Sequence, residues 1–187
     1  FPGSACTSVN EVVVHGIPSK KKILKEGDIL SLDLGVNYQG YHTDSAWTYP
    51  VGKVDTKVEK LLEVTKNALF IGIEVIKPGA TVNQISHAIE NYLKPFGYGI
   101  VEEFTGHGIG RNLHEDPQIP NFGAELRDVV LKTGMTFCVE PMVNLGTKRI
   151  RILQDNWTTV TQDKSYSAHY EHTILVTDNG YEILTKI

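Results

Sequence analysis

The chain has 187 residues, of which 41% are hydrophobic and 21% are charged, and its formal net charge is −4 at pH 7. This is the composition of an ordinary globular protein, with no electrostatic basis for binding nucleic acid or an acidic membrane and no apolar run long enough to span one. The two cysteines, Cys6 and Cys138, form neither a disulfide framework nor a Cys-x-x-Cys motif, which favours a reduced, cytoplasmic setting.

The first predicted element is a short apolar strand over residues 10–15, and a β-hairpin over residues 29–47 follows it. A turn centred between Tyr38 and Gln39 would place Asp33 directly opposite Asp44, with Cβ atoms about 5 Å apart. Like charges there destabilise a hairpin, so a cation is expected between them. The alternative is a pair of solvent-facing aspartates that never meet.

The hairpin alternation assigns different roles to its two faces. The aspartate face carries small residues that leave room beside the carboxylates. The other face carries Leu30, Leu32, Leu34 and Trp47, and is expected to pack in the core.

Two helices are predicted in the middle of the chain. Residues 56–59 and 81–84 match capping boxes, and each is followed by apolar residues at a helical period. Lys77-Pro78-Gly79 ends the first helix and Pro95 ends the second. Both read as the cover of a sheet.

The second half of the chain is predicted to be mostly β-structure. We expect strands over residues 100–104, 131–143 and 157–161, and a hairpin from residue 170 to residue 185. Residues 105–110 (TGHGIG) are expected to form a tight glycine-rich turn that carries His107, and residues 111–121 to be irregular.

A weak internal repeat relates the two halves. Residues 24–33 and 131–140 share the pattern Leu-Lys-x-Gly-x5-acid, which matches Asp33 with Glu140. A His-Gly-Ile precedes each copy, and a later strand bears a second acid, Asp44 or Glu171. Matches this short also arise by chance. If real, the repeat predicts two similar sheets whose acids converge at the axis between them.

Four carboxylates cannot converge in a cleft unless they are protonated or bound to metal. Two divalent cations would balance their charge, and His107 is the best candidate for a nitrogen ligand. This ligand mixture suits Mn, Fe, Co or Zn, and such a pair of ions supports hydrolysis. The alternatives remain that His107 is only a turn residue and that His15 and His114 lie on the surface.

Taken together, the motifs closely resemble those of the methionine aminopeptidases over the whole chain. The resemblance rests on the segments VVVHGIP, SLDLGVNYQGYHTDSAWTYPVG, GHGIGRNLHEDPQIPNFG, LKTGMTFCVEPMVN and YEHTILVTDNGYEILT. It implies the α+β pita-bread fold, with one peptidase domain over residues 1–187 and pseudo-symmetric halves of roughly 1–97 and 98–187. The short spacing between Glu140 and Glu171 favours type 1. Compared with the family, the sequence is expected to lack the usual N-terminal stretch before Phe1.

The resemblance also implies roles for individual residues. Asp33, Asp44, His107, Glu140 and Glu171 would be the metal ligands, with Asp44 and Glu171 bridging. Glu140 would shuttle the proton, His114 would hydrogen-bond the scissile carbonyl and His15 would lie near the leaving amide. Cys6 and Trp157 would line the methionine pocket.

The implied activity is removal of the initiator methionine from new proteins by water activated between two divalent ions (Co, Mn, Fe or Zn). The implied partners are nascent peptides, with possible transient contact with the ribosome, and the protein is expected to be a monomer. The alternatives are an X-Pro aminopeptidase or prolidase-like enzyme, and a non-catalytic binding module of the same fold.

Overall fold

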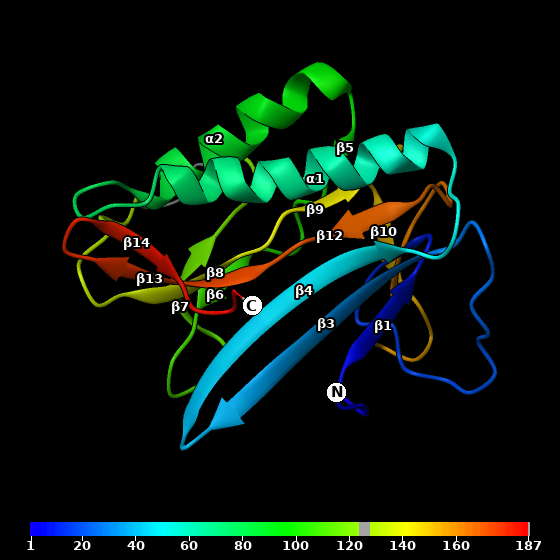
Figure 1. Cartoon of the computed structure of the whole chain (residues 1–187), viewed down its shortest axis with the longest axis horizontal. Coiled ribbons are helices and arrows are strands. Elements are labelled where there is room, and N and C mark those ends of the chain that lie inside the picture. Colours follow the sequence, from blue (N-terminus) through cyan, green and yellow to red (C-terminus); the bar gives the residue numbers. More distant parts are fainter. Residues whose placement is uncertain (124–127, 187) are drawn as a thin grey trace.

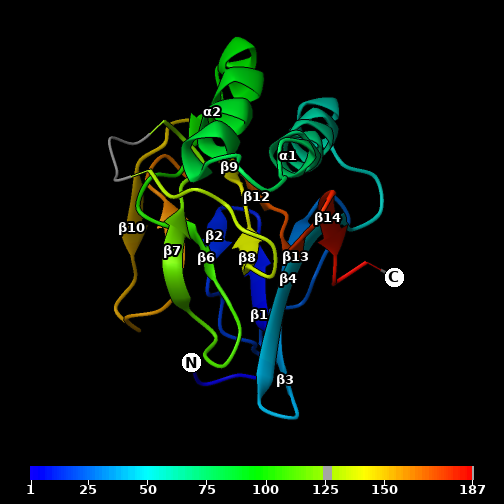
Figure 2. The same ribbon diagram turned by 90° about the vertical axis from the view of Figure 1, so that its left-hand side faces the viewer.

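The computed structural model describes residues 1–123 and 128–186. Figures 1 and 2 show two helices lying side by side on one face of the molecule, with the strands beneath them and a long hairpin extending away. The strand neighbours are antiparallel, so the predicted α+β class is confirmed. Over the described residues, no helix is both long and apolar enough to span a bilayer.

The helices begin at strong caps. The helix α1 (Thr56–Glu74) is capped by the Asp55 carboxylate, which accepts a hydrogen bond from the Lys57 backbone N–H at 2.8 Å. The predicted capping box at Thr56 is therefore wrong, because Asp55 occupies the capping position one residue earlier. The box at Thr81 is confirmed and opens α2 (Val82–Leu93), which runs into the 3₁₀ turn η1 (Lys94–Phe96) that contains Pro95.

The hairpin is formed by β3 (Ile29–Tyr38) and β4 (Tyr41–Pro50). Gln39 and Gly40 form its turn, with φ of 51° and 81°, and two-residue hairpin turns favour positive φ at both positions. Asp33 consequently pairs with Ala46 and Asp44 with Gly35, so the predicted pairing of Asp33 with Asp44 is wrong by two positions. An even shift leaves both aspartates on the same face.

The remaining strands complete four sheets. The strand β1 (Cys6–Val9) lies on the other side of β3. A five-stranded sheet has the order β14 (Gly180–Ile183), β13 (His172–Thr177), β8 (Thr136–Val139), β6 (Gly106–Gly108) and β7 (Glu115–Ile119). The smaller sheets are β12 (Ser167–His169), β9 (Met142–Asn144) and β5 (Gly99–Ile100), and β10 (Ile150–Ile152), β11 (Thr159–Thr161) and β2 (Val12–Val14).

Several predicted strand boundaries in the second half are wrong. The predicted turn over residues 105–110 contains β6, and the irregular stretch contains β7. The predicted strand over residues 131–143 divides into β8 and β9, because Pro141 has no N–H with which to continue the ladder. The strand expected over residues 100–104 is reduced to β5.

The core lies between the helices and the strands of the second half. Leu61, Leu69 and Ile85 from the helices and Phe137 and Ile174 from the strands are fully buried in it. The outer face of the hairpin differs from its prediction. Trp47 packs against this core, Leu30 and Leu32 are half-buried, and Leu34 is exposed.

The strand orders bear on the internal repeat. In the order β1-β3-β4, the central strand carries Asp33, and the strand that carries Asp44 lies beside it. In the order β6-β8-β13, the central strand leads into Glu140, and the strand that follows Glu171 lies beside it. The two His-Gly-Ile segments do not occupy equivalent places in the sheets. The first follows β2, which pairs with β11, whereas the second begins within β6, which pairs with β8. The division into halves at residue 97 stays a prediction.

Candidate metal centre

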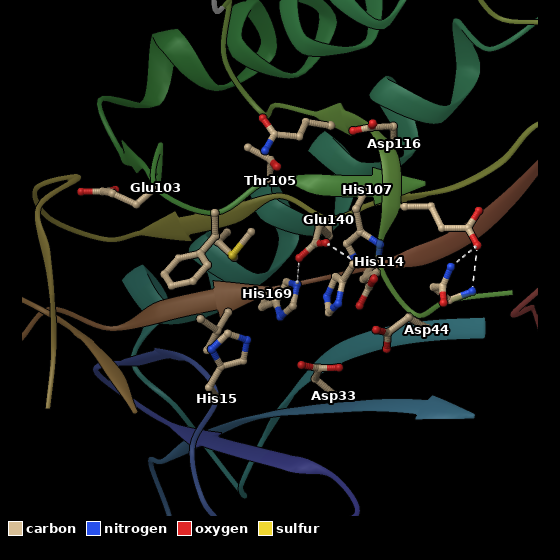
Figure 3. Close-up of a pocket in the computed structure, with 17 residues that line it drawn as sticks. His15, Asp33, Asp44, Glu103, Thr105, His107, His114, Asp116, Glu140 and His169 are labelled. Carbon is tan, nitrogen blue, oxygen red and sulfur yellow. Dashed lines mark hydrogen bonds and ion pairs between the residues drawn. The ribbon is translucent and has the colours of Figure 1, made fainter. Parts of the chain in front are cut away.

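A cleft of about 650 Å³ lies where the hairpin meets the strands of the second half. All five predicted metal ligands line it, together with His15 and His114. Figure 3 shows Asp33 and Asp44 facing His114, His169 and Glu140 across a common space. The residues lining this cleft are Val14, His15, Asp33, Asp44, Glu103, Phe104, Thr105, His107, Asn112, His114, Glu115, Asp116, Gln118, Glu140, Met142, His169 and Glu171.

Asp33 and Asp44 reach the cleft from the same face of the hairpin, as diagonal neighbours. The backbone of Asp44 is tied to the second half through Thr173. The Thr173 hydroxyl accepts from the Asp44 N–H at 2.9 Å and donates to the Asp44 carbonyl at 2.8 Å. These bonds hold the aspartate beside the strand that follows Glu171.

His107 occupies the middle of β6, where its neighbours must be glycines. A Cβ at Gly106 would overlap the carbonyl oxygen of Cys138, and one at Gly108 would overlap the carbonyl oxygen of Asp116. The His107 Nδ1–H donates to the Gly108 carbonyl at 3.0 Å, which leaves Nε2 as the nitrogen with a free lone pair. The imidazole is thereby oriented as a ligand.

Glu140 and Glu171 enter from breaks in the second-half strands. Glu140 directly follows β8, and its backbone carbonyl accepts from the Asn121 amide at 3.1 Å. Glu171 lies between β12 and β13, and its N–H donates to the Ala46 carbonyl of the hairpin at 2.8 Å. Both side chains are buried, and the Glu171 Oε1 atom has no hydrogen-bond partner among the described residues.

The crowded carboxylates resist ionisation in the absence of cations. Burial, followed by the charge of Glu140, raises the pKa of Asp44 to about 6. Burial raises the pKa of Glu140 to about 8, and burial together with the neighbouring acids raises the pKa of Glu171 well above its ordinary value. Divalent cations would reverse these shifts, because they favour the charged form of each acid.

The donor set fits such cations. Donor atoms of Asp33, Asp44 and Glu171 lie within 4.8 Å of one another, as do those of Glu140, His169 and Glu171. The Nε2 atom of His107 lies 3.5 Å from Oε1 of Glu140. Carboxylate and imidazole donors at this spacing, with an orphaned oxygen among them, match a carboxylate-rich site for divalent ions.

The two further histidines predicted for this site also face the cleft. The ring centroid of His114 lies 4.2 Å from that of His107. His15 has a φ of 59°, a conformation that costs a non-glycine residue energy and is common where a side chain is held for function. Burial lowers the pKa of both imidazoles, so both favour the neutral form.

Cys6 and Trp157 lie beside the cleft and are not among the residues that line it. Cys6 pairs with Asp33 across β1 and β3, and burial followed by the Asp33 carboxylate raises the pKa of its thiol. The Trp157 ring makes edge contacts with the rings of Phe1 and His15, with centroids 5.5 Å and 6.1 Å apart. Their part in a side-chain pocket stays a prediction.

His169 also lines the cleft, and sequence reasoning did not include it among the site residues. Its Nε2 atom lies 3.4 Å from Oε2 of Glu140. The signal was present, because a residue two positions before Glu171 shares its face in an extended chain. Cys138 and His172 are buried and are not among the residues that line the cleft.

Comparisons with known proteins agree with this geometry. The model of metallopeptidase family M24 matches residues 1–178. The chain is 50% identical over 187 residues to methionine aminopeptidase 1 of Bacillus subtilis, covering all of this chain and 75% of that protein. The methionine aminopeptidase structure from Thermotoga maritima has a TM-score of 0.95 and 50% identity, over 98% of this chain and 74% of that one.

A prolidase structure is more distant. That of Pyrococcus furiosus has a TM-score of 0.79 and 28% identity, covering 99% of this chain and 49% of that one. The pita-bread fold expected from the sequence is therefore confirmed.

Proposed function

The chain belongs to metallopeptidase family M24, and on that premise we propose that it is a methionine aminopeptidase that removes the N-terminal methionine of proteins and peptides. One observation of the structure carries this proposal. The acids of the hairpin, the acids of the second half and His107 converge on a single cleft. The greater likeness to methionine aminopeptidases than to prolidases supports the choice of substrate.

Two divalent ions, drawn from Co, Mn, Fe and Zn, would be held by the five predicted ligands. Asp33 would bind one ion, and His107 and Glu140 would bind the other. Asp44 and Glu171 would each bind both ions. Ions bound there would lower the pKa of a water molecule and polarise the peptide carbonyl. The burial of Glu140 and Glu171 strengthens this chemistry by keeping bulk water away from the charges.

The side chains of the cleft supply the proton transfers and hydrogen bonds. Glu140 is the proton carrier: its carboxylate accepts a proton from the attacking water and returns it to the leaving amine. His114 donates a hydrogen bond to the carbonyl oxygen, where negative charge develops in the transition state. His15 also lines the cleft, next to Phe104 with ring centroids 5.4 Å apart, and would contact the leaving amide.

Substrate selection would involve the side of the cleft near His15. Trp157 and Cys6 would contribute to the pocket for the methionine side chain, Trp157 through its contact with His15. The partners would be the N-termini of nascent peptides, with transient contact at the ribosome, and the protein would act as a monomer in the cytoplasm.

The test is hydrolysis of Met-Ala-Ser by the 187-residue protein after chelation, with Mn²⁺, Co²⁺, Fe²⁺ or Zn²⁺ titrated back. We expect methionine release that requires the metal and that is lost in Asp44→Asn, whose backbone hydrogen bonds to Thr173 can remain. A folded, metal-loaded protein that releases nothing from Met-Ala-Ser and cleaves an X-Pro dipeptide would assign it to the prolidase class instead. Release that is indifferent to chelation would contradict the proposed metal chemistry.

A further inference from the structure

His169 presents a buried nitrogen to the cleft. The residue is 2% exposed, and its Nε2 atom has no hydrogen-bond partner among the residues that the structure describes. Buried polar atoms almost always have a partner, so each exception requires an explanation. In Figure 3 the ring of His169 points toward Glu140 and shares the space with His114 and Asp33.

The backbone holds His169 in this position independently of the cleft. Its N–H donates to the Thr48 hydroxyl at 2.9 Å, and that hydroxyl donates to the His169 carbonyl at 2.8 Å. Thr48 is itself 2.8 Å from the Ser31 hydroxyl within the hairpin. The residue also ends β12, which pairs with β9. The backbone of His169 is therefore held both by the pairing of β12 with β9 and by hydrogen bonds to the hairpin, and a metal ligand needs such support.

The distances match those between two ligands of one ion. Oε2 of Glu140 lies 3.4 Å from the His169 Nε2 atom, and Oε1 lies 3.5 Å from the His107 Nε2 atom. Two donors at bonds of about 2.0–2.1 Å to a tetrahedral ion lie about 3.3–3.4 Å apart. The two oxygens of Glu140 thus face one imidazole each.

The alternative is that His169 only orients Glu140 through a hydrogen bond, and this alternative explains fewer of the observed distances. Such a role would need its ring N–H directed at Oε2 of Glu140, and Nε2 makes no hydrogen bond within the described part of the chain. The donor atoms of Glu140, His169 and Glu171 also lie within 4.8 Å of one another, so three buried groups face one small volume. One cation would satisfy both the His169 nitrogen and the unpartnered Glu171 oxygen.

We propose that His169 is a further nitrogen ligand of the metal centre, binding an ion together with Glu140 and Glu171. This inference rests on the proposed function for the existence of the centre, and adds to the five ligands predicted from the sequence. A second imidazole would favour Co²⁺ and Zn²⁺ over Mn²⁺, because imidazole suits the former and carboxylate the latter.

The direct test uses the wild-type protein, labelled with ¹⁵N at its seven histidines and loaded with ¹¹³Cd²⁺. We expect two imidazole nitrogens, those of His107 and His169, to show scalar coupling to cadmium. His107→Gln and His169→Gln assign the signals. Coupling at His107 alone would overturn the proposal. The number of coupled imidazole nitrogens is read from the wild-type protein, so a variant that fails to fold cannot change that number.

Metal affinity supplies the second readout. In His169→Gln we expect the affinity for Co²⁺ to fall at least about tenfold, since loss of a group that merely orients a ligand already costs about 10–100-fold. The affinity for Mn²⁺ should fall less. His172→Gln is the matched control, because His172 is also buried but bonds to Thr185 outside the cleft. Equal losses for both metals would contradict the proposal. Normal coupling at both histidines with no methionine release would instead leave this inference intact and refute the proposed function.

Discussion

The charge on Asp44 should make the metal-free protein less stable as the pH rises. Burial and the neighbouring Glu140 raise the pKa of Asp44 from 3.8 to about 6 in the folded protein. The folded state therefore keeps a proton that the unfolded chain releases. The stability that this Asp44 proton contributes is fully present below about pH 4 and is lost as the pH rises through about 6.

The size of this effect follows from the pKa difference. A change from 3.8 to about 6 corresponds to about 3 kcal/mol of unfolding free energy lost by pH 8. Asp44→Asn keeps the shape of the side chain and cannot ionise. We therefore expect it to be more stable than the metal-free wild type at pH 8, by up to about 3 kcal/mol, and to differ little at pH 4.

Urea unfolding in the presence of a chelator at pH 4 and pH 8, with both proteins side by side, measures this difference. Comparing the two proteins cancels the titration of His15 and His114, which changes stability in the opposite direction. Divalent metal at pH 8 should stabilise the wild type more than Asp44→Asn. A stability difference between the two proteins that is the same at both pH values would refute the reasoning.

Three further substitutions test other parts of the structure. His114→Ala should lower kcat by about 10²–10³-fold without changing metal affinity. Methionine release and metal titration measure the two quantities, and a weaker metal affinity would make His114 a ligand instead. Gly106→Ala should destabilise the fold by more than Gly134→Ala, and urea midpoints compare them. At Gly106 the methyl group overlaps the Cys138 carbonyl, whereas at Gly134 it meets nothing within 4 Å and the only cost is alanine at a φ of 89°. Thr81→Ala removes the capping box of α2 and should cost about 1 kcal/mol in the same assay, and no loss would mean that α2 does not depend on its cap.

The sequence by itself predicted the residues of the site, and it determined the local elements that depend on short-range order. The side-chain alternation placed Asp33 and Asp44 on one face of the hairpin, although the pairing was wrong by two positions. The face on which a side chain lies changes only when the register shifts by an odd number of residues, whereas the exact pairing depends on the turn geometry at Gln39 and Gly40. The helices α1 and α2 were predictable because capping and a 3.6-residue period are local signals.

Only the tertiary structure decided how the second half forms its strands and which groups meet. The glycines around His107 suggested a turn, and the structure makes them part of a strand because neighbouring backbones approach too closely for any Cβ. The place of His169 depends on Thr48, 121 positions away in the sequence, and on β9. Contacts between such distant segments leave no periodic signal in one sequence. The sequence could therefore predict the five proposed ligands, whereas the fold alone brings the buried imidazole of His169 to the same cleft.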